Sequence, residues 1–80
     1  MGLAKKPSRA KKKSGLAQQF GLNIRRIRKD RGLSQEALAD GARLAPTYVG
    51  QIERGKRSPT LDVVERLAEA LGVKPSDLLQ

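Results

Sequence analysis

Residues 46–60, PTYVGQIERGKRSPT, combine hydrogen-bonding side chains with a run of positive charge. Thr47, Tyr48 and Gln51 carry hydroxyl and amide groups that one short helix can present together. The cations that follow them are Arg54, Lys56 and Arg57. Hydroxyls and amides can bond to the edges of other polar molecules, and closely spaced cations can neutralise phosphates. This chemistry serves the recognition of a polyanion and offers nothing that would break a covalent bond.

Whole classes of catalyst are excluded by two absent residue types. The 80-residue chain contains no cysteine and no histidine. Without histidine there is no His general base, no His metal ligand and no Ser-His-Asp triad, and without cysteine there is no disulfide or thiolate metal site. We therefore expect a protein that is not an enzyme and needs no cofactor. Because no apolar run reaches the length of a membrane span and no signal region is recognisable, we expect it to be soluble and cytoplasmic.

The charge balance indicates an anionic partner. Seventeen lysines and arginines face 8 aspartates and glutamates, which leaves a net charge of +9 and a pI of about 10.7. Such a charge on a short chain favours nucleic acid first and an anionic membrane surface second. One tyrosine and one phenylalanine are too few for the base-stacking surfaces of single-stranded RNA recognition, which favours duplex DNA.

Charge is distributed unevenly along the chain. Residues 1–19 hold six of the 17 cations and no acid, so residues 20–80 hold the other 11 cations and all 8 acids. We expect residues 1–19 to be a disordered tail, which adds nonspecific DNA affinity or serves only solubility, because they have few apolar residues. They also lack the apolar half of a membrane-surface helix. Residues 20–80 should form a single domain.

Helical periodicity runs through residues 20–80, and no strand pattern appears there. Phe20, Ile24 and Ile27 lie at i, i+4 and i+7, which predicts a first helix. Residues suited to start the later helices, as caps or as a first-turn proline, are Ser34, Pro46, Thr60 and Ser76. The residues predicted to face inward on these helices are Ala37, Leu38, Ala42, Val49, Ile52, Leu61, Val64, Leu67, Ala68 and Leu71. The pattern predicts an all-α domain of five helices.

Three motifs at these separations resemble a known family. LSQEALA, YVGQIERGKRSPTLD and LAEALGV are similar to the helix-turn-helix family of lambda repressor and Cro, often called the XRE family. The resemblance covers residues 23–79 and implies a five-helix, lambda-repressor-like DNA-binding domain. It implies that residues 34–42 form the first helix of the motif and that residues 46–54 form the recognition helix, which enters the major groove.

The resemblance also implies roles for individual side chains. The residues expected to contact bases are Pro46, Thr47, Tyr48, Gln51 and Arg43, and those expected to contact the DNA backbone are Ser34, Gln35, Arg54, Lys56 and Arg57. Gln51 can pair with adenine through two hydrogen bonds or can be merely solvated. The ring of Tyr48 could instead pack along the edge of the bundle, and Arg43 could be a solvated turn residue. Pro46 and Ala45 depart from the family pattern, since neither offers a polar group at the helix start.

Two further expectations concern charge pairing and assembly. Glu53 would be unfavourable beside phosphates, and the resemblance implies that it pairs with Arg28 of the first helix. One recognition helix reads few base pairs, so a homodimer on a palindromic operator is expected. The interface candidates on or near the fifth helix are Val73, Leu78 and Leu79, which could instead only cover the core.

The resemblance therefore predicts a sequence-specific, duplex-DNA-binding transcriptional regulator from a bacterium or a phage, such as a restriction–modification controller or a small phage repressor. We expect control by protein concentration and no small-molecule ligand. The alternative is an antitoxin-type protein-interaction module with secondary DNA binding. An antitoxin should expose an additional apolar patch or a partner-binding unfolded segment, whereas residues 1–19 are cationic and poor in apolar side chains.

Overall fold

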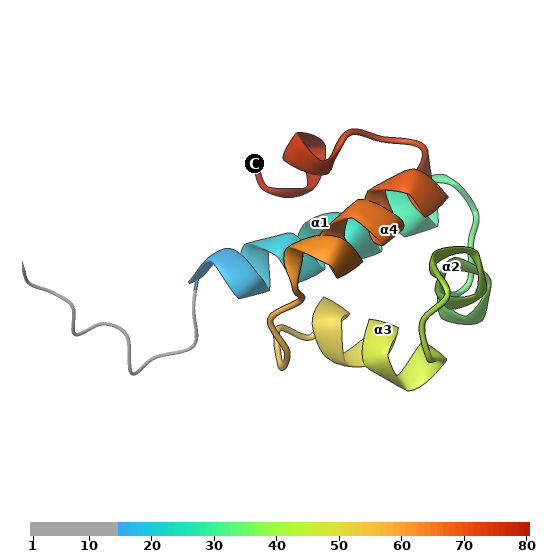
Figure 1. Ribbon diagram of the computed structural model, residues 1–80, viewed down its shortest axis with the longest axis horizontal. Coiled ribbons are helices and arrows are strands. Elements are labelled where there is room, and N and C mark those ends of the chain that lie inside the picture. The colour runs from blue at the N-terminus through green and yellow to red at the C-terminus, as the bar shows by residue number, and fades with distance from the viewer. Residues whose placement is uncertain (1–14) are drawn as a thin grey trace, which may run out of the picture.

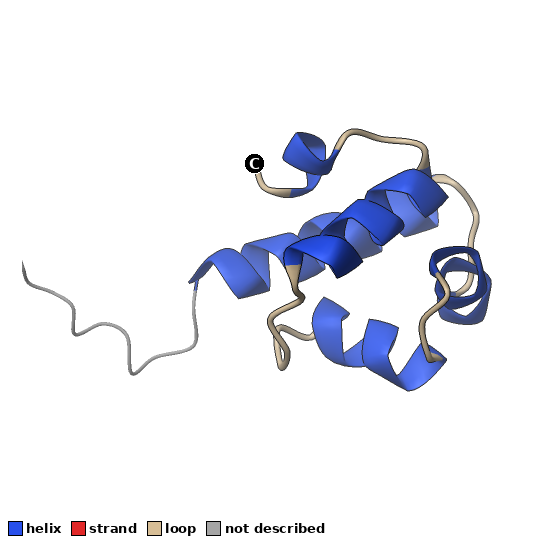
Figure 2. Cartoon of the chain, in the orientation of Figure 1, coloured by secondary structure: helices blue, strands red, loops and turns tan. Residues whose placement is uncertain are grey.

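The structure, a computed structural model, describes residues 15–80, and these residues form four α-helices and one turn of 3₁₀ helix (Figure 1). In chain order they are α1 (Gly15–Asp30), α2 (Gln35–Ala42), α3 (Pro46–Glu53), α4 (Leu61–Leu71) and η2 (Pro75–Leu78). Only helices and loops occur in this part of the chain (Figure 2). The predicted all-α class is confirmed.

The predicted fifth helix is wrong in type. Residues 75–78 form a single 3₁₀ turn, because the segment is four residues long and starts at a proline that donates no hydrogen bond. The predicted cap, Ser76, lies inside the turn. The cap position belongs to Lys74, whose backbone N–H donates to Oδ2 of Asp77 at 3.0 Å.

The first helix begins earlier than predicted. Residues 15–19, which were assigned to the disordered tail, are the start of α1. Leu16 lies four residues before Phe20 and so continues the apolar spacing, which is the signal that the sequence interpretation missed. The remainder of the tail, residues 1–14, lies outside the described residues.

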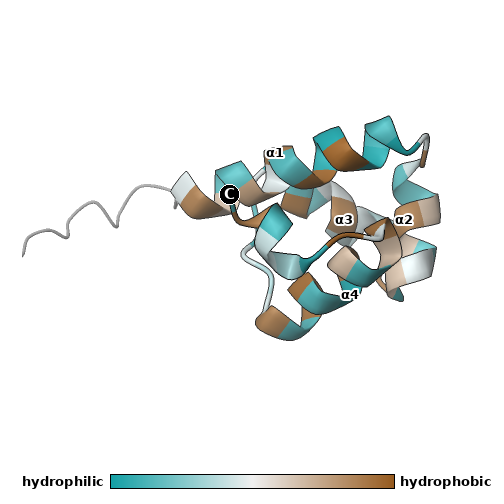
Figure 3. Cartoon of the chain, turned by 90° about the horizontal axis from the view of Figure 1, so that it is seen from above, coloured by the Kyte–Doolittle hydropathy of each residue, from teal (hydrophilic) through white to brown (hydrophobic). Residues whose placement is uncertain are grey.

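The core lies where all the elements meet. Within it, α3 packs against α1 and α2, α4 packs against α2 and η2, and η2 also contacts α1. Hydrophilic and hydrophobic bands alternate along α1 in Figure 3, as expected for an amphipathic helix. The largest fully buried side chains are Phe20, Ile24, Leu38, Val49, Ile52, Leu67, Leu71 and Leu78.

Two residues predicted to face inward lie at the surface. Ala37 is exposed, and Ala39 is buried in its place, so the buried face of α2 is rotated from the expected one. Leu61 is 81% exposed, because it is the first residue of α4 and projects beyond the elements that cover the rest of the helix.

Side-chain hydrogen bonds define several helix ends. Ser34 Oγ accepts from the backbone N–H of Ala37 at 2.9 Å, and Thr60 Oγ1 accepts from that of Val63 at 3.2 Å, which confirms both predicted caps. The buried Asn23 of α1 donates from Nδ2 to the carbonyl oxygens of Leu78 at 2.9 Å and Gln80 at 3.1 Å. These bonds hold the last residues of the chain against α1.

Candidate nucleic-acid interface

The helix α3 has a buried side and an exposed side. Val49 and Ile52 are fully buried, which seats the helix on α1 and α2. Pro46 and Thr47 are exposed and Gln51 is half-buried, so these three side chains are available at the surface. Tyr48 is half-buried and packs against the core, in line with the alternative that its ring lies along the edge of the bundle. The helix therefore presents the two-sided arrangement that groove reading requires.

A tight turn sets α2 against α3. Arg43 adopts the left-handed conformation, with φ 59° and ψ 48°, just after α2. The backbone N–H of Leu44 then donates to the carbonyl of Ala39 at 2.8 Å, and α3 begins at Pro46. Ala45 provides no side-chain cap, as the sequence indicated. The first turn of α2, with Ser34 and Gln35, and the exposed face of α3 thus belong to one helix-turn-helix unit.

A buried polar cluster joins all three helices of this region. Arg28 of α1 donates from Nε to Glu53 Oε2 at 2.6 Å and from Nη2 to Oε1 at 3.1 Å. Gln35 of α2 donates from Nε2 to the same Oε1 at 3.0 Å. The side chains of Arg28 and Glu53 are only 10% and 4% exposed, so the predicted ion pair is confirmed and is buried. Gln35, expected at the DNA backbone, has one amide hydrogen engaged inside the protein.

The charges in this cluster stabilise one another. Burial opposes ionisation of Glu53, but hydrogen bonds from Arg28 and Gln35, together with the charges of Arg28 and Arg25, hold the pKa of Glu53 below its ordinary value. The hydrogen bond to Glu53 raises the pKa of Arg28 despite burial of the guanidinium. Both groups are therefore ionised at neutral pH, and the anion is neutralised internally before it can repel a phosphate.

Two glycines permit close contacts around α3. A Cβ atom on Gly21 of α1 would lie 2.3 Å from the carbonyl oxygen of Ile52, so α1 crosses α3 at a distance that only glycine allows. A Cβ atom on Gly50 would lie 3.4 Å from Arg54 Nη1 and 3.6 Å from Gln35 Oε1. Gly50 thus leaves space in which the side chains of Gln35 and Arg54 lie beside α3.

The three cations after α3 are all exposed, but their surroundings differ. The Arg57 side chain folds back over the helix, where its Nε donates to Gln51 Oε1 at 3.1 Å. Its guanidinium carbon lies 5.6 Å from the centre of the Tyr48 ring, within the range of a cation–π contact. Arg54 follows directly at the helix end, and Lys56 lies in the loop. The sequence spacing gave no sign of the cluster formed by Tyr48, Gln51 and Arg57.

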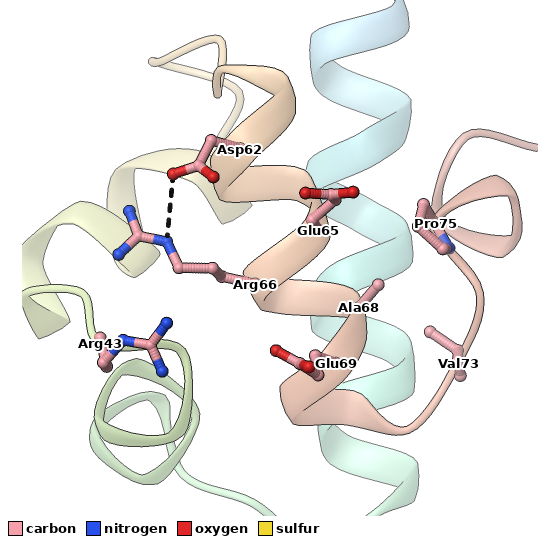
Figure 4. A pocket seen from close by; sticks show the side chains of 8 residues that line it. All are labelled: Arg43, Asp62, Glu65, Arg66, Ala68, Glu69, Val73 and Pro75. Atoms are coloured by element: carbon pink, nitrogen blue, oxygen red, sulfur yellow. Dashed lines mark ion pairs between the residues drawn. The ribbon is translucent and has the colours of Figure 1, made fainter.

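The structure does not bring Arg43 together with the other predicted base readers. Its side chain lines a hollow between the end of α2 and α4, shared with Asp62, Glu65 and Glu69 (Figure 4). Arg66 pairs with Asp62 there, with Nε and Oδ2 3.6 Å apart. The Arg43 guanidinium therefore faces an acidic surface of α4 and is separate from the cluster on α3.

Among the predicted dimer contacts, Leu78 is wrong. It is fully buried and fills the core, so it is unavailable to a partner. Val73 is half-buried against the core, and Leu79 is 43% exposed. Leu16 and Leu61, 57% and 81% exposed, were not predicted at the surface. They line one hollow of about 220 Å³ with Pro59 and Leu79, and none of the eight residues around it is charged. We call this surface, with Leu16, Pro59, Leu61 and Leu79, the leucine patch.

Residues 15–80 contain no group of three or more acidic, histidine or cysteine side chains that could hold a metal ion. None of the described helices is long and apolar enough to cross a membrane.

Comparisons with known proteins agree with this geometry. The helix-turn-helix family HTH_3 matches residues 24–78. Control protein C.BamHI of Bacillus amyloliquefaciens is 48% identical over 61 residues, which cover 75% of each chain. The immunity repressor protein of Bacillus phage phi105 is 41% identical over 59 residues, 74% of this chain and 41% of the repressor. Among solved structures, the restriction-modification controller protein C.AhdI from Aeromonas hydrophila has 42% identity and a TM-score of 0.76, covering 78% of this chain and 94% of that one.

Proposed function

Because the chain belongs to the helix-turn-helix family of DNA-binding transcriptional regulators, we propose that two copies of it bind a palindromic duplex through paired α3 helices. The observation that carries this proposal is the exposed face of α3, where Thr47 and Gln51 lie four residues apart on one side while Val49 and Ile52 are buried. The bases would be read by Pro46, Thr47, Tyr48 and Gln51. Arg54 and Lys56 would contact phosphates, as would the free amide hydrogen of Gln35 and the hydroxyl of Ser34.

The regulatory role that fits best is that of a controller protein. The similarity to C.BamHI and C.AhdI extends over most of all three chains. Selection of bound duplexes from a random pool tests the DNA-binding proposal directly. We expect enrichment of an inverted repeat with half-site centres about 34 Å apart, one turn of duplex. Recovery of no preferred sequence would overturn it.

The leucine patch is the surface that we assign to a second copy. It is formed by the start of α1, the loop after α3, the start of α4 and the last residues of the chain, which lie at one end of the molecule in Figure 1. The helix α3 runs along an adjacent edge in Figure 1, and a two-fold axis at this end that lies perpendicular to the DNA would place both α3 helices on one face. Leu61 projects beside the hollow, which lets the leucine of each copy enter the hollow of the other.

The absence of charge in the leucine patch is compatible with a second copy as its partner. Two chains of net charge +9 repel each other, so the contact between them must be uncharged, as the leucine patch is. Its eight lining residues are fewer than the 20 to 30 per partner of a typical stable interface. We therefore expect a dimer that dissociates on dilution and is reinforced when duplex DNA neutralises the repulsion, which makes binding steep in protein concentration.

The substitution Leu61→Asp tests this assignment, with Leu22→Asp as its control. Leu22 is 59% exposed on α1 but does not line the leucine patch. Sedimentation across a concentration series should show a monomer–dimer equilibrium for the wild type and for Leu22→Asp, and only monomer for Leu61→Asp. Wild-type protein that remains monomeric at every concentration and binds a palindrome one copy at a time would overturn the dimer without affecting DNA binding.

The antitoxin alternative gains one observation, since an apolar patch is exposed after all. It predicts that the purified wild-type chain stays monomeric and that the leucine patch is covered by a different protein. A wild-type dimer that Leu61→Asp dissociates would exclude that use of the patch.

A further inference from the structure

The loop after α3 is fixed to Gln51 at two points. The backbone N–H of Lys56 donates to the Gln51 carbonyl at 2.9 Å, while the Gln51 side chain accepts from Arg57 Nε at 3.1 Å. Gly55, with φ 74°, makes the sharp return possible, and a Cβ atom there would lie 2.9 Å from Gln18 Cγ. The chain therefore turns sharply at the end of α3, and the Arg57 side chain reaches back from the loop to the helix.

Two contacts restrict the Arg57 guanidinium. Gln51 accepts from Nε, and the guanidinium carbon lies 5.6 Å from the centre of the Tyr48 ring, which is itself packed against the core. An arginine that is already ordered loses less side-chain entropy on binding than one that is free in a loop. Because Nε is occupied, the two terminal nitrogens are the donors left for a ligand.

The same hydrogen bond changes what Gln51 can read. A bidentate pair with adenine needs both the oxygen and the nitrogen of the glutamine amide, and here the bond from Arg57 uses one of the two lone pairs of the oxygen and orients the amide towards Arg57. Two parallel donors on an arginine instead match O6 and N7 of guanine. Since Gln51 lies one turn after Thr47 on the exposed side of α3, the arginine that it holds belongs to the base-reading face and not to the wall of the groove.

We infer that Arg57 reads a guanine in each half-site, with Gln51 and Tyr48 as its positioning residues. The inference rests on the proposed function, and it replaces two expectations from the sequence, a phosphate contact for Arg57 and an adenine contact for Gln51. The partner chemistry is the O6/N7 edge of guanine in the major groove. Lys56, the neighbouring cation, keeps a phosphate role.

Selections from a random duplex pool should be run in parallel on the wild type, Arg57→Ala and Lys56→Ala. We expect Arg57→Ala to lose one guanine from the half-site motif and to leave the other positions unchanged, with guanine preference falling roughly 5- to 150-fold. Lys56→Ala, which removes the same charge, should keep the whole motif, bind all duplexes more weakly and reduce the salt slope by about one.

The recovered site then permits an atom-level test. Replacing its guanine by 7-deazaguanine removes the N7 acceptor, so wild-type affinity should fall roughly fivefold or more while Arg57→Ala binds both duplexes equally. For the positioning residues, Gln51→Ala and Tyr48→Ala should lower the guanine-to-adenine preference ratio at this one position. Tyr48→Phe keeps the ring and should retain the ratio.

A contact between Arg57 and phosphate would give a different result in the same experiments. If Arg57→Ala keeps the full motif and loses affinity uniformly, Arg57 contacts phosphate and the inference is wrong, although the chain still binds specific DNA. Arg57→Lys provides a second variant that keeps the charge but not the fork. A phosphate contact would survive this change, whereas the two-donor pair with guanine would be lost and the guanine preference would fall. If the wild type itself enriches no motif, the proposed function fails first.

Discussion

The helices α3 and α4 are stabilised in different ways. The start of α4 is capped by Thr60, its end is followed by Gly72 at φ 73°, and Val64, Leu67 and Leu71 give it a buried stripe. The eight residues of α3 have no side-chain cap, and the helix is positioned by the Arg28–Glu53–Gln35 cluster and the crossing at Gly21. The position of α3, the helix proposed to read DNA, therefore depends on its neighbours, and its own exposed residues are free for a ligand.

The largest effect on stability is expected from Glu53→Gln, which disrupts the buried ion pair that positions α3. The variant leaves the charge of the buried Arg28 uncompensated, so the free energy of unfolding in urea should fall by about 3 kcal/mol. Glu65→Gln, on the exposed face of α4, is the matched control and should change it by less than about 0.5 kcal/mol. Equal losses from the two variants would contradict the special dependence of α3.

The same pair predicts a dependence on pH. Because the pKa of Glu53 is lowered in the folded protein, its contribution is complete above the unfolded value of about 4.3 and is lost as the pH falls through the folded value. Urea titrations below pH 5 should therefore show the wild type losing stability towards that of Glu53→Gln. Curves that stay parallel down to pH 2 would show that the carboxylate charge contributes nothing.

A smaller effect is expected from Gly21→Ala, which places a methyl group against the backbone of α3. The nearest atom, the Ile52 carbonyl oxygen, would be only 2.3 Å away, so α1 and α3 must separate at a cost of about 1–3 kcal/mol. Gly41→Ala in α2, where the nearest atom is the Ala70 Cβ at 3.4 Å, should be neutral or slightly stabilising. Thermal unfolding measures both, and amide exchange should show faster opening of α3 in the first variant alone.

Changes to the helix caps of α3 and α4 should alter the free energy of unfolding by about 1 kcal/mol. Thr60→Ala removes the acceptor for the Val63 N–H and should destabilise the domain by that amount. Ala45→Ser supplies α3 with the acceptor that it lacks and should stabilise it by about 0.5–1 kcal/mol. Chemical denaturation of the single and double variants provides the measurement. A destabilising Ala45→Ser would mean that the start of α3 cannot accept a cap.

The smallest expected effect lies within α4 itself. Leu61→Ser should change the stability of the monomer by less than about 0.5 kcal/mol, because the side chain is 81% exposed, whereas the fully buried Leu67→Ala should cost about 2–5 kcal/mol. Both are measured at a protein concentration low enough to keep the chain monomeric. A large loss in Leu61→Ser under those conditions would place Leu61 in the fold and not at an interface.

Local signals predicted most of the fold. Ser34 and Thr60 are caps because their side chains bond within their own first turns, and apolar spacing identified Val49 and Ile52 as the buried side of α3. The end of the chain was less predictable. Leu78 and Leu79 are adjacent leucines, and the 3₁₀ turn buries the first and exposes the second, which depends on how η2 lies against α1 and α4.

The candidate site was predictable only in part, because the contacts of its side chains also depend on how the helices pack. Residue identities and a family resemblance located the exposed face of α3 and the Arg28–Glu53 pair. They could not show that Gln35 joins that pair or that Arg57 reaches back to Gln51, because both contacts depend on where a long side chain settles after the helices pack. Leu61 was predicted to be buried because it lies on the apolar face of α4. Periodicity does not show that the elements packed on this face leave its first residue uncovered.

The hydrogen bond from Gln35 to Glu53 connects the surface of the molecule with its interior. If a backbone phosphate draws the Gln35 amide outward, Glu53 loses one of the bonds that favour its ionised form, and its proton affinity rises. The carboxyl carbon of this one glutamate would then be a built-in spectroscopic reporter. Its chemical shift, followed by NMR on a labelled sample, would report DNA binding from the interior of the protein. No probe would need to be attached to the DNA-binding surface.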